Sequence, residues 1–155
     1  MPTLRLLQLN VWSGSTYELD WDARQFSSYE TPSDAETRYS SLLALVKKHE
    51  PDVLTLNECM PSPDYATRLA RDLGFSCYTR TALAGIVVGP FHFPSAKITE
   101  GDAVLAKPEF HLTPLGRQAL TGWVLGESLS FNTDNATQIL AASIEKGGRT
   151  FAIGW

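Results

Sequence analysis

Two polar side chains stand at the ends of two apolar segments of this 155-residue chain. Asn10 closes the segment LRLLQLN, and Glu58 closes the segment DVLTLNE. A carboxylate and an amide oxygen suit a hard cation such as Mg²⁺, which binds one or two carboxylates and completes its shell with water or substrate phosphate. Spacing alone leaves a second interpretation open, in which Glu58 is a solvated strand-end charge and Asn10 begins a turn.

The elements that must position these residues alternate along the chain. Leu4–Trp12 predicts a strand buried on both faces, and Asp52–Glu58 predicts a second strand. The capping-box pattern SDAE predicts a helix between them with Ser33 as its N-cap. If the two strands are neighbours, their carboxyl ends bring Asn10 and Glu58 together, where ligands bind in open α/β sheets.

The remaining segments extend this pattern. A second helix is expected from Ser62-Pro63, with Pro63 at its first position, to Gly74 as its C-terminal cap, followed by a strand at Phe75–Arg80. Turn residues then separate short strands, and Lys146-Gly147-Gly148-Arg149 predicts a hairpin turn. These strands are expected at residues 85–88, 102–106, 110–113, 119–125, 138–144 and 150–155. The order β-α-β-α-β followed by strands predicts one α/β domain over residues 1–155, with helices covering a sheet.

Composition narrows the class of protein. The chain is 43% hydrophobic and 19% charged, which excludes a disordered tail and a coiled coil. A net charge of −4 argues against binding nucleic acid by phosphate neutralisation alone, although a bound divalent metal supplies local positive charge. Cys59 and Cys77 form neither a disulfide framework nor a metal-ligand spacing. The sequence shows no signal peptide and no membrane span, which predicts a cytoplasmic protein.

The succession of motifs resembles the endonuclease/exonuclease/phosphatase superfamily, which has the DNase I-like fold. The resemblance rests on LRLLQLNVW, a helix containing Arg38, EPDVLTLNE, a helix ending in LARDLGF, and GDAVLAK, in that order. In that family the asparagine of the first strand, here Asn10, lies near the phosphate and the metal. The glutamate that ends the second strand, here Glu58, binds the catalytic Mg²⁺. The glutamine that usually precedes this glutamate is Asn57 here, which keeps the amide.

The resemblance implies a four-layer α/β sandwich, of which this chain would be an incomplete N-terminal portion with a mixed sheet. Family members continue into T-H-L, G-D-hydrophobic-N and S-D-H motifs, and none of these occurs in this sequence. His49, His92 and His111 all stand in other contexts. We therefore expect a partial domain that has little or no turnover alone, and whether it is an enzyme depends on completion of the domain.

The function implied is hydrolysis of a phosphate ester with Mg²⁺, or with Mn²⁺ as an alternative, in a phosphodiesterase, nuclease or phosphatase. The substrate class stays open among nucleic acid, lipid and small molecule. A non-catalytic binding module on the same scaffold is the competing hypothesis, against which the presence of Glu58 argues. A third hypothesis is an unrelated α/β domain, which would require Asn10 and Glu58 to lie far apart. Weaker candidates are Glu100 and Asp102, which flank a glycine before a strand, and Arg117.

Overall fold

The computed structural model describes most of the chain as helices, strands and the turns between them. The described residues are 3–11, 17–20, 25–28, 31–60, 62–84, 87–88, 91–92, 99–120, 123–125, 129–131 and 138–154. The elements are β1 (Leu6–Asn10), β2 (Tyr17–Asp20), β3 (Gln25–Ser28), α1 (Pro32–His49), β4 (Val53–Cys59), α2 (Asp64–Leu73), β5 (Ser76–Ala84), β6 (Val87–Val88), β7 (Phe91–His92), β8 (Thr99–Ala106), the 3₁₀ helix η1 (Pro108–Phe110), β9 (Thr113–Ala119), β10 (Trp123–Leu125), β11 (Leu129–Phe131), β12 (Gln138–Lys146) and β13 (Arg149–Gly154).

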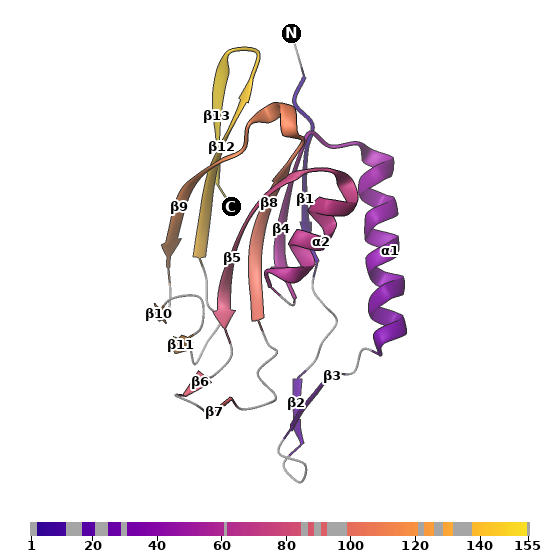
Figure 1. The fold of residues 1–155 in the computed structure, drawn as a ribbon, viewed down its shortest axis with the longest axis vertical. Coiled ribbons are helices and arrows are strands. Elements are labelled where there is room, and N and C mark those ends of the chain that lie inside the picture. Colours follow the sequence, from indigo (N-terminus) through magenta and orange to yellow (C-terminus); the bar gives the residue numbers. More distant parts are fainter. Residues whose placement is uncertain are drawn as a thin grey trace.

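A four-stranded mixed sheet forms the centre of the molecule, with strand order β1-β4-β8-β5. β1 and β4 are parallel, and the crossover that parallel neighbours need includes α1, whereas β8 runs antiparallel to both β4 and β5. Both helices lie on one face of this sheet (Figure 1). The predicted α/β class, the mixed sheet and the helical layer are therefore confirmed.

The helix side of the sheet is closed by a cluster of apolar side chains. α2 contributes Ala66 and Leu69, which are fully buried against Leu54, Leu56 and Leu105 of the sheet. Alternation along β4 and β8 sends every second residue to this face. Each buried leucine contributes about 1.5–3 kcal/mol relative to an exposed one, so this cluster fixes how α2 lies on the sheet.

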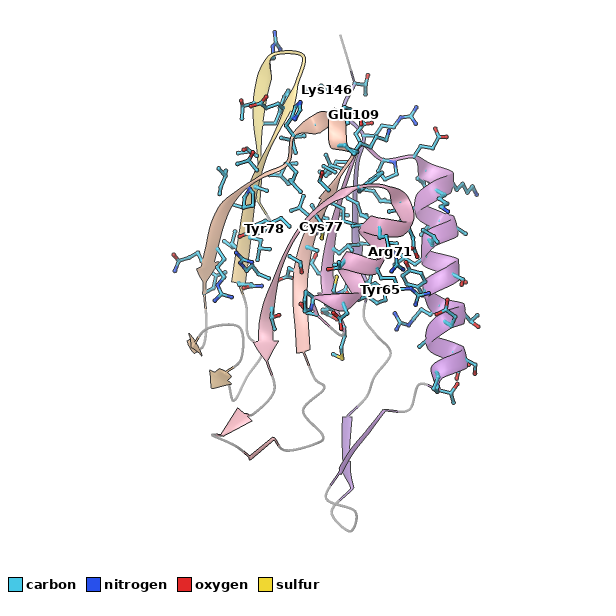
Figure 2. All side chains as sticks on the ribbon, viewed as in Figure 1. Tyr65, Arg71, Cys77, Tyr78, Glu109 and Lys146 are labelled. Atoms are coloured by element: carbon cyan, nitrogen blue, oxygen red, sulfur yellow. The ribbon has the colours of Figure 1, made fainter. Side chains whose placement is uncertain are left out.

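A second sheet, β13-β12-β9, covers part of the other face. Its residues Leu140 and Ile144 are fully buried against Val53 and Val104, which belong to the opposite alternation set of the central sheet. Tyr78 of β5 joins the same cluster, and Figure 2 shows it between the two sheets. The described helices and sheets thus form three successive layers. Smaller two-stranded pairs are β2-β3, β6-β7 and β10-β11.

Asp52 ties the two sheets together at the start of β4. Its carboxylate accepts hydrogen bonds from Lys107 Nζ at 2.9 Å, from Lys146 Nζ at 3.2 Å and from the backbone amide of Arg5 at 3.1 Å. Burial raises the pKa of Asp52, but the bonds from Lys107, Arg5 and Lys146 outweigh it and lower the pKa to about 2. Lys146 also lies 4.9 Å from the ring centre of Phe110. A charged anchor therefore holds this end of the sandwich.

The helix boundaries differ from the sequence prediction at two points. α1 begins at Pro32 with Thr31 as its N-cap, so the prediction of Ser33 as N-cap is wrong. The Thr31 hydroxyl accepts from the Asp34 amide at 3.2 Å, and proline suits the first helical position that follows. In α2 the N-cap is Pro63 and the helix begins at Asp64, one position later than predicted, while Gly74 caps the C-terminus with φ 71° as predicted. Neither helix, nor any other in the described residues, is long and apolar enough to cross a membrane.

The later strands follow the prediction in part. The hairpin between β12 and β13 is confirmed, and its turn residues Gly147 and Gly148 have φ values of 58° and 72°, which glycine adopts readily. The strand predicted at 110–113 is wrong, because η1 occupies Pro108–Phe110 and β9 begins only at Thr113. A three-residue 3₁₀ helix that begins with a proline replaces the strand there, and its Phe110 is buried in the second cluster.

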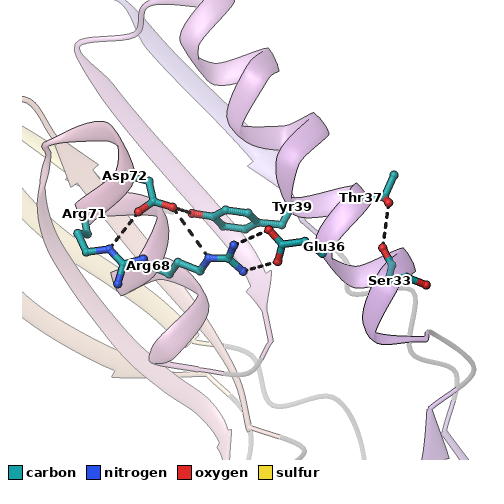
Figure 3. A network of polar contacts seen from close by, with 7 residues as sticks. All are labelled: Ser33, Glu36, Thr37, Tyr39, Arg68, Arg71 and Asp72. Atoms are coloured by element: carbon teal, nitrogen blue, oxygen red, sulfur yellow. Dashed lines mark hydrogen bonds and ion pairs between the residues drawn. The ribbon is translucent and has the colours of Figure 1, made fainter.

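A network of charged and aromatic groups joins α1 to α2 (Figure 3). Arg68 donates two hydrogen bonds to the Glu36 carboxylate, at 2.9 and 2.6 Å, and its guanidinium lies 3.7 Å from the ring centre of Tyr39. The Tyr39 hydroxyl donates to Asp72 at 2.6 Å, and Arg71 donates to the other oxygen of Asp72 at 3.0 Å. Burial, then the bond to Asp72, raises the pKa of Tyr39. The two helices are therefore fixed to each other as well as to the sheet.

Tyr39→Phe is expected to lower the free energy of unfolding by about 1 kcal/mol, because it removes one hydrogen bond from a buried hydroxyl and keeps the ring. Urea unfolding followed by circular dichroism measures this change. Ser41→Ala is the control, since the exposed Ser41 hydroxyl on the same helix donates to the Thr37 carbonyl at 2.9 Å, within one turn of its own helix. Equal losses in the two variants would contradict a specific role for the Tyr39–Asp72 bond.

Candidate active site

Asn10 and Glu58 lie at the carboxyl ends of neighbouring parallel strands. In the β1–β4 ladder Asn10 is the register partner of Asn57, and the Val11 amide donates to the Asn57 carbonyl at 3.0 Å. Register partners in adjacent strands are about 4.8 Å apart and share a face of the sheet. The sequence expectation that these two ends converge is confirmed in position, and the unrelated-domain hypothesis, which required them to be far apart, is wrong. Their chemical roles stay a prediction.

Glu58 sits in a β-bulge. Leu56 pairs with Ala103 and Cys59 pairs with Gly101, so two residues of β4 oppose the single residue Asp102 of β8. Glu58 has φ 57°, a left-handed conformation that is uncommon for a residue with a side chain. Bulges of this kind redirect side chains and are frequent beside active sites. The backbone therefore departs from regular strand geometry at Glu58, which is the residue predicted from the sequence to bind the metal.

The bulge also determines which residue enters the helix-side core. Leu54 and Leu56 belong to that cluster, and strict alternation would place residue 58 there next. Cys59 takes this place instead and is fully buried, while Glu58 is only half-buried. The extra residue thus keeps a carboxylate out of the apolar layer and at the strand end beside Asn10.

The carboxyl group of Asp102 is the centre of a polar cluster beneath Glu58. It accepts from the Asn57 side-chain amide at 3.2 Å and from the Gln138 side-chain amide at 3.0 Å, and the backbone amide of Glu58 faces it closely enough to lower its pKa. Burial raises the pKa of Asp102, and the bonds from Gln138, Asn57 and Glu58 only partly offset this effect. The Thr79 hydroxyl donates to the Asp102 backbone carbonyl at 2.9 Å. From the sequence, Asp102 is predicted either to approach a metal or to belong to a hairpin turn, and neither interpretation includes this cluster.

Gln138 is a member of this cluster that sequence reasoning missed. It begins β12 in the second sheet and also contacts the Arg80 carbonyl, at 3.4 Å. No local pattern marks a glutamine that reaches a carboxylate 36 positions away in sequence. Its contact joins the second sheet to the central sheet beside the candidate site.

Gly101 occupies a tight space next to this cluster. It is buried, and a Cβ atom at this position would lie within 3.0 Å of the Arg80 carbonyl oxygen and of the Ser62 side chain. Ser62 is itself buried and its hydroxyl shares a hydrogen bond with the Thr81 hydroxyl, at 3.2 Å. Only glycine therefore lets β8 approach Arg80 of β5 and Ser62 this closely, next to the Asp102 position opposite the bulge.

The other sequence candidates are spread over the structure. Arg117, in β9, donates to the Thr81 carbonyl at 3.3 Å, so it contacts β5 rather than standing alone. His49 ends α1 and His111 follows η1, so these two histidines do not belong to the strand ends of the site. The side chains of Glu100 and His92 lie outside the described residues.

The donor set at the two strand ends fits a hard divalent cation. Glu58 offers carboxylate oxygens and Asn10 an amide oxygen, which are ligands that Mg²⁺ accepts while it keeps water or phosphate in its remaining positions. Within the described residues no three histidine, cysteine, aspartate or glutamate side chains gather as a complete metal cage. The arrangement therefore suits a metal shared with a ligand rather than a metal held by protein groups alone.

Comparisons with known proteins agree with this geometry. The sequence profile described as the Endonuclease/Exonuclease/phosphatase family matches residues 7–143. A mannosyl-6-phosphatase from Bacteroides thetaiotaomicron superposes with a TM-score of 0.59 and 11% identity, covering 98% of this chain and 50% of that one. The human Nocturnin catalytic domain with bound sulfate gives 0.54 and 14%, covering 97% and 48%. Humanised TDP2 from D. rerio gives 0.54 and 16%, also covering 97% and 48%. No curated protein sequence matches this chain.

The likeness to these solved structures is a likeness of fold, because their sequence identities are low. The chain spans about half the length of each of them, and it is superposed over nearly its whole length. The DNase I-like fold class that the sequence predicted is therefore confirmed.

Proposed function

Because the chain belongs to the endonuclease/exonuclease/phosphatase family, we propose that it supplies one side of a metal-dependent phosphoesterase site built on Asn10 and Glu58. The observation that carries this proposal is the parallel pairing of β1 with β4, which sets Asn10 beside Asn57 and the bulged Glu58. Ligands bind at such carboxyl strand ends in α/β sheets. The reaction is hydrolysis of a phosphate ester.

Members of this family generally depend on a divalent metal. In the proposed site Glu58 and Asn10 would hold Mg²⁺, or Mn²⁺ in its place. Such an ion neutralises charge on the phosphate oxygens as the transition state forms. Glu58 suits the role because the bulge keeps it half-buried at the strand end rather than inside the apolar layer.

Asn10 has the second role in the proposal. Its amide donates and accepts hydrogen bonds, so it can orient a phosphate oxygen or the attacking water as well as contact the metal. It lies on the exposed edge strand of the central sheet, where a ligand has access. Glu58 and Asn10 take the roles of metal and phosphate contacts in this proposal. Hydrolysis therefore requires a further group, a base that activates the water.

The substrate class in this proposal is a phosphate ester without further restriction. The superposed structures are a mannosyl-6-phosphatase, Nocturnin and TDP2, and this fold-level likeness does not choose one substrate for this chain. The net charge of −4 weakly favours a substrate smaller than a nucleic acid, since it gives no general attraction for a phosphate backbone.

Titration calorimetry with Mn²⁺ tests the metal site directly. Glu58→Gln is expected to weaken Mn²⁺ binding tenfold or more, because it removes the only carboxylate of the proposed pair. Glu109→Gln is the matched control, since Glu109 is exposed in η1 at the other end of the sheet (Figure 2). Dimethyl phosphate serves as the ester probe and should tighten Mn²⁺ binding by the unmodified chain, and Asn10→Ala should reduce that gain.

Two outcomes would contradict the proposal. One is Mn²⁺ binding that is the same in the unmodified chain and in Glu58→Gln. The other is binding of dimethyl phosphate that needs neither metal nor Glu58, which would favour a non-catalytic binding module on this scaffold.

A further inference from the structure

The bulge in β4 interrupts the regular pairing with β8. The β4–β8 register stops at Leu56 and resumes at Cys59, so Asn57 and Glu58 together oppose the single residue Asp102. The Glu58 backbone amide faces the Asp102 carboxyl group closely enough to lower the pKa of that group.

The same carboxyl group also fixes the residue before Glu58. Asn57 donates its side-chain amide to one Asp102 oxygen at 3.2 Å, while Gln138 donates to the other oxygen at 3.0 Å. One side chain of β8 thus holds Asn57 by a hydrogen bond and faces the backbone amide of Glu58. Gln138 comes from the second sheet, so the position of this carboxyl group is set from two sides.

We propose that Asp102 is a positioning residue, which holds the Asn57–Glu58 bulge and thereby aims the Glu58 carboxylate at the metal and phosphate. This inference rests on the function proposed above. It assigns to Asp102 no contact with the substrate. Asp102 acts on the site through the backbone of Glu58 and the side chain of Asn57.

A direct role for Asp102 as a metal ligand fits the structure less well. Each of its two oxygens already accepts a hydrogen bond from a side-chain amide, one from Asn57 and one from Gln138. A carboxylate that orients a metal ligand binds protein donors in this way, whereas a ligating carboxylate directs its lone pairs at the ion. Among the described residues Asp102 is also not part of a three-member metal-binding group.

Three variants of the chain test the inference by Mn²⁺ calorimetry. Asp102→Ala should weaken Mn²⁺ binding about tenfold, the lower end of the effect of losing an orienting group beside a metal ligand. Asp102→Asn keeps the shape and one acceptor oxygen and should weaken binding less, which covers the case in which the alanine variant does not fold. Thr79→Val is the matched control, because it removes a bond to the Asp102 backbone but leaves its carboxyl group intact.

A readout independent of the metal is amide hydrogen exchange at Glu58, measured by NMR on the chain without added metal. Exchange should accelerate at least tenfold in Asp102→Ala relative to Thr79→Val at equal temperature. If Asp102 only stabilised the fold, both variants would have lower melting temperatures, and exchange at the Glu58 amide would not accelerate more than exchange at other amides.

A double variant separates the possible failures. In the Glu58→Gln background, adding Asp102→Ala should cause no further loss of Mn²⁺ binding, because Asp102 acts through Glu58. A further loss would make Asp102 a metal ligand and overturn the inference. Unchanged binding in Asp102→Ala, with weakened binding in Glu58→Gln, would overturn the inference and leave the proposed function standing. Unchanged binding in Glu58→Gln alone would overturn the proposed function itself.

Discussion

Gly101→Ala is expected to lower the free energy of unfolding by about 3 kcal/mol, at the upper end of the usual cost of overpacking a tight site. The added methyl group would press on the Arg80 carbonyl of β5 and on the Ser62 side chain at once. The carbonyl belongs to Arg80, which pairs with Asp102 in the ladder between β5 and β8, so its movement would disturb that pairing. Urea unfolding followed by circular dichroism gives the loss.

Gly154→Ala is the matched control for this prediction. Gly154 also lies in a strand, but a Cβ there would stand 3.8 Å from the Leu140 carbonyl, which is ordinary van der Waals contact. Alanine is more favourable than glycine in a strand by about 0.5–1 kcal/mol, so this variant should be neutral or slightly stabilised. Similar losses at both positions would show that the space around Gly101 does not decide the result.

Asp52→Asn is expected to cost about 2.5 kcal/mol of stability at pH 7. The Asp52 side chain is only 13% exposed, and its replacement leaves the ammonium groups of Lys107 and Lys146 half-buried without a carboxylate. The magnitude follows from the difference between the ordinary pKa of 3.8 and the value of about 2 in the folded chain. Chemical unfolding of both proteins at pH 7 measures it.

The pH dependence of this effect has a definite sign. Because folding lowers the pKa of Asp52, its contribution is fully present above pH 3.8 and is lost as the pH falls through about 2. The stability difference between the unmodified chain and Asp52→Asn should therefore shrink between pH 4 and pH 2. Glu50→Gln is the control, since Glu50 is 74% exposed and its ion pair with Arg5 spans 3.5 Å. A difference that persists unchanged at pH 2 would contradict the assigned pKa.

Local sequence patterns predicted the central elements because those elements carry strong local signals. The strand ending at Asn10 and the strand ending near Glu58 are continuous apolar runs, and both were found within a few residues of their observed ends. The N-cap of α1 was misplaced because Thr31 and Ser33 are both good caps. The proline between them was the signal that favours Thr31, since proline is common directly after the cap.

The candidate site was predictable only as far as its two strand ends. The resemblance placed Asn10 and Glu58 together, and the register of β1 and β4 agrees with that placement. The bulge could not be predicted, because LTLNEC reads as an ordinary strand until Asp102 is known to lie opposite it. The contact from Gln138 depends on packing between two sheets and leaves no trace in either segment.

The bulge makes Glu58 an insertion into a ladder that would be complete without it. Leu56 and Cys59 keep regular partners on either side, so a chain shorter by one residue between them could pair with β8 without moving any buried neighbour. Such a deletion would also relieve a left-handed backbone that costs of order 1–3 kcal/mol. The pairing of β4 with β8 therefore does not depend on Glu58. Deletion of this one residue could remove the charge from the end of β4 and leave the fold intact.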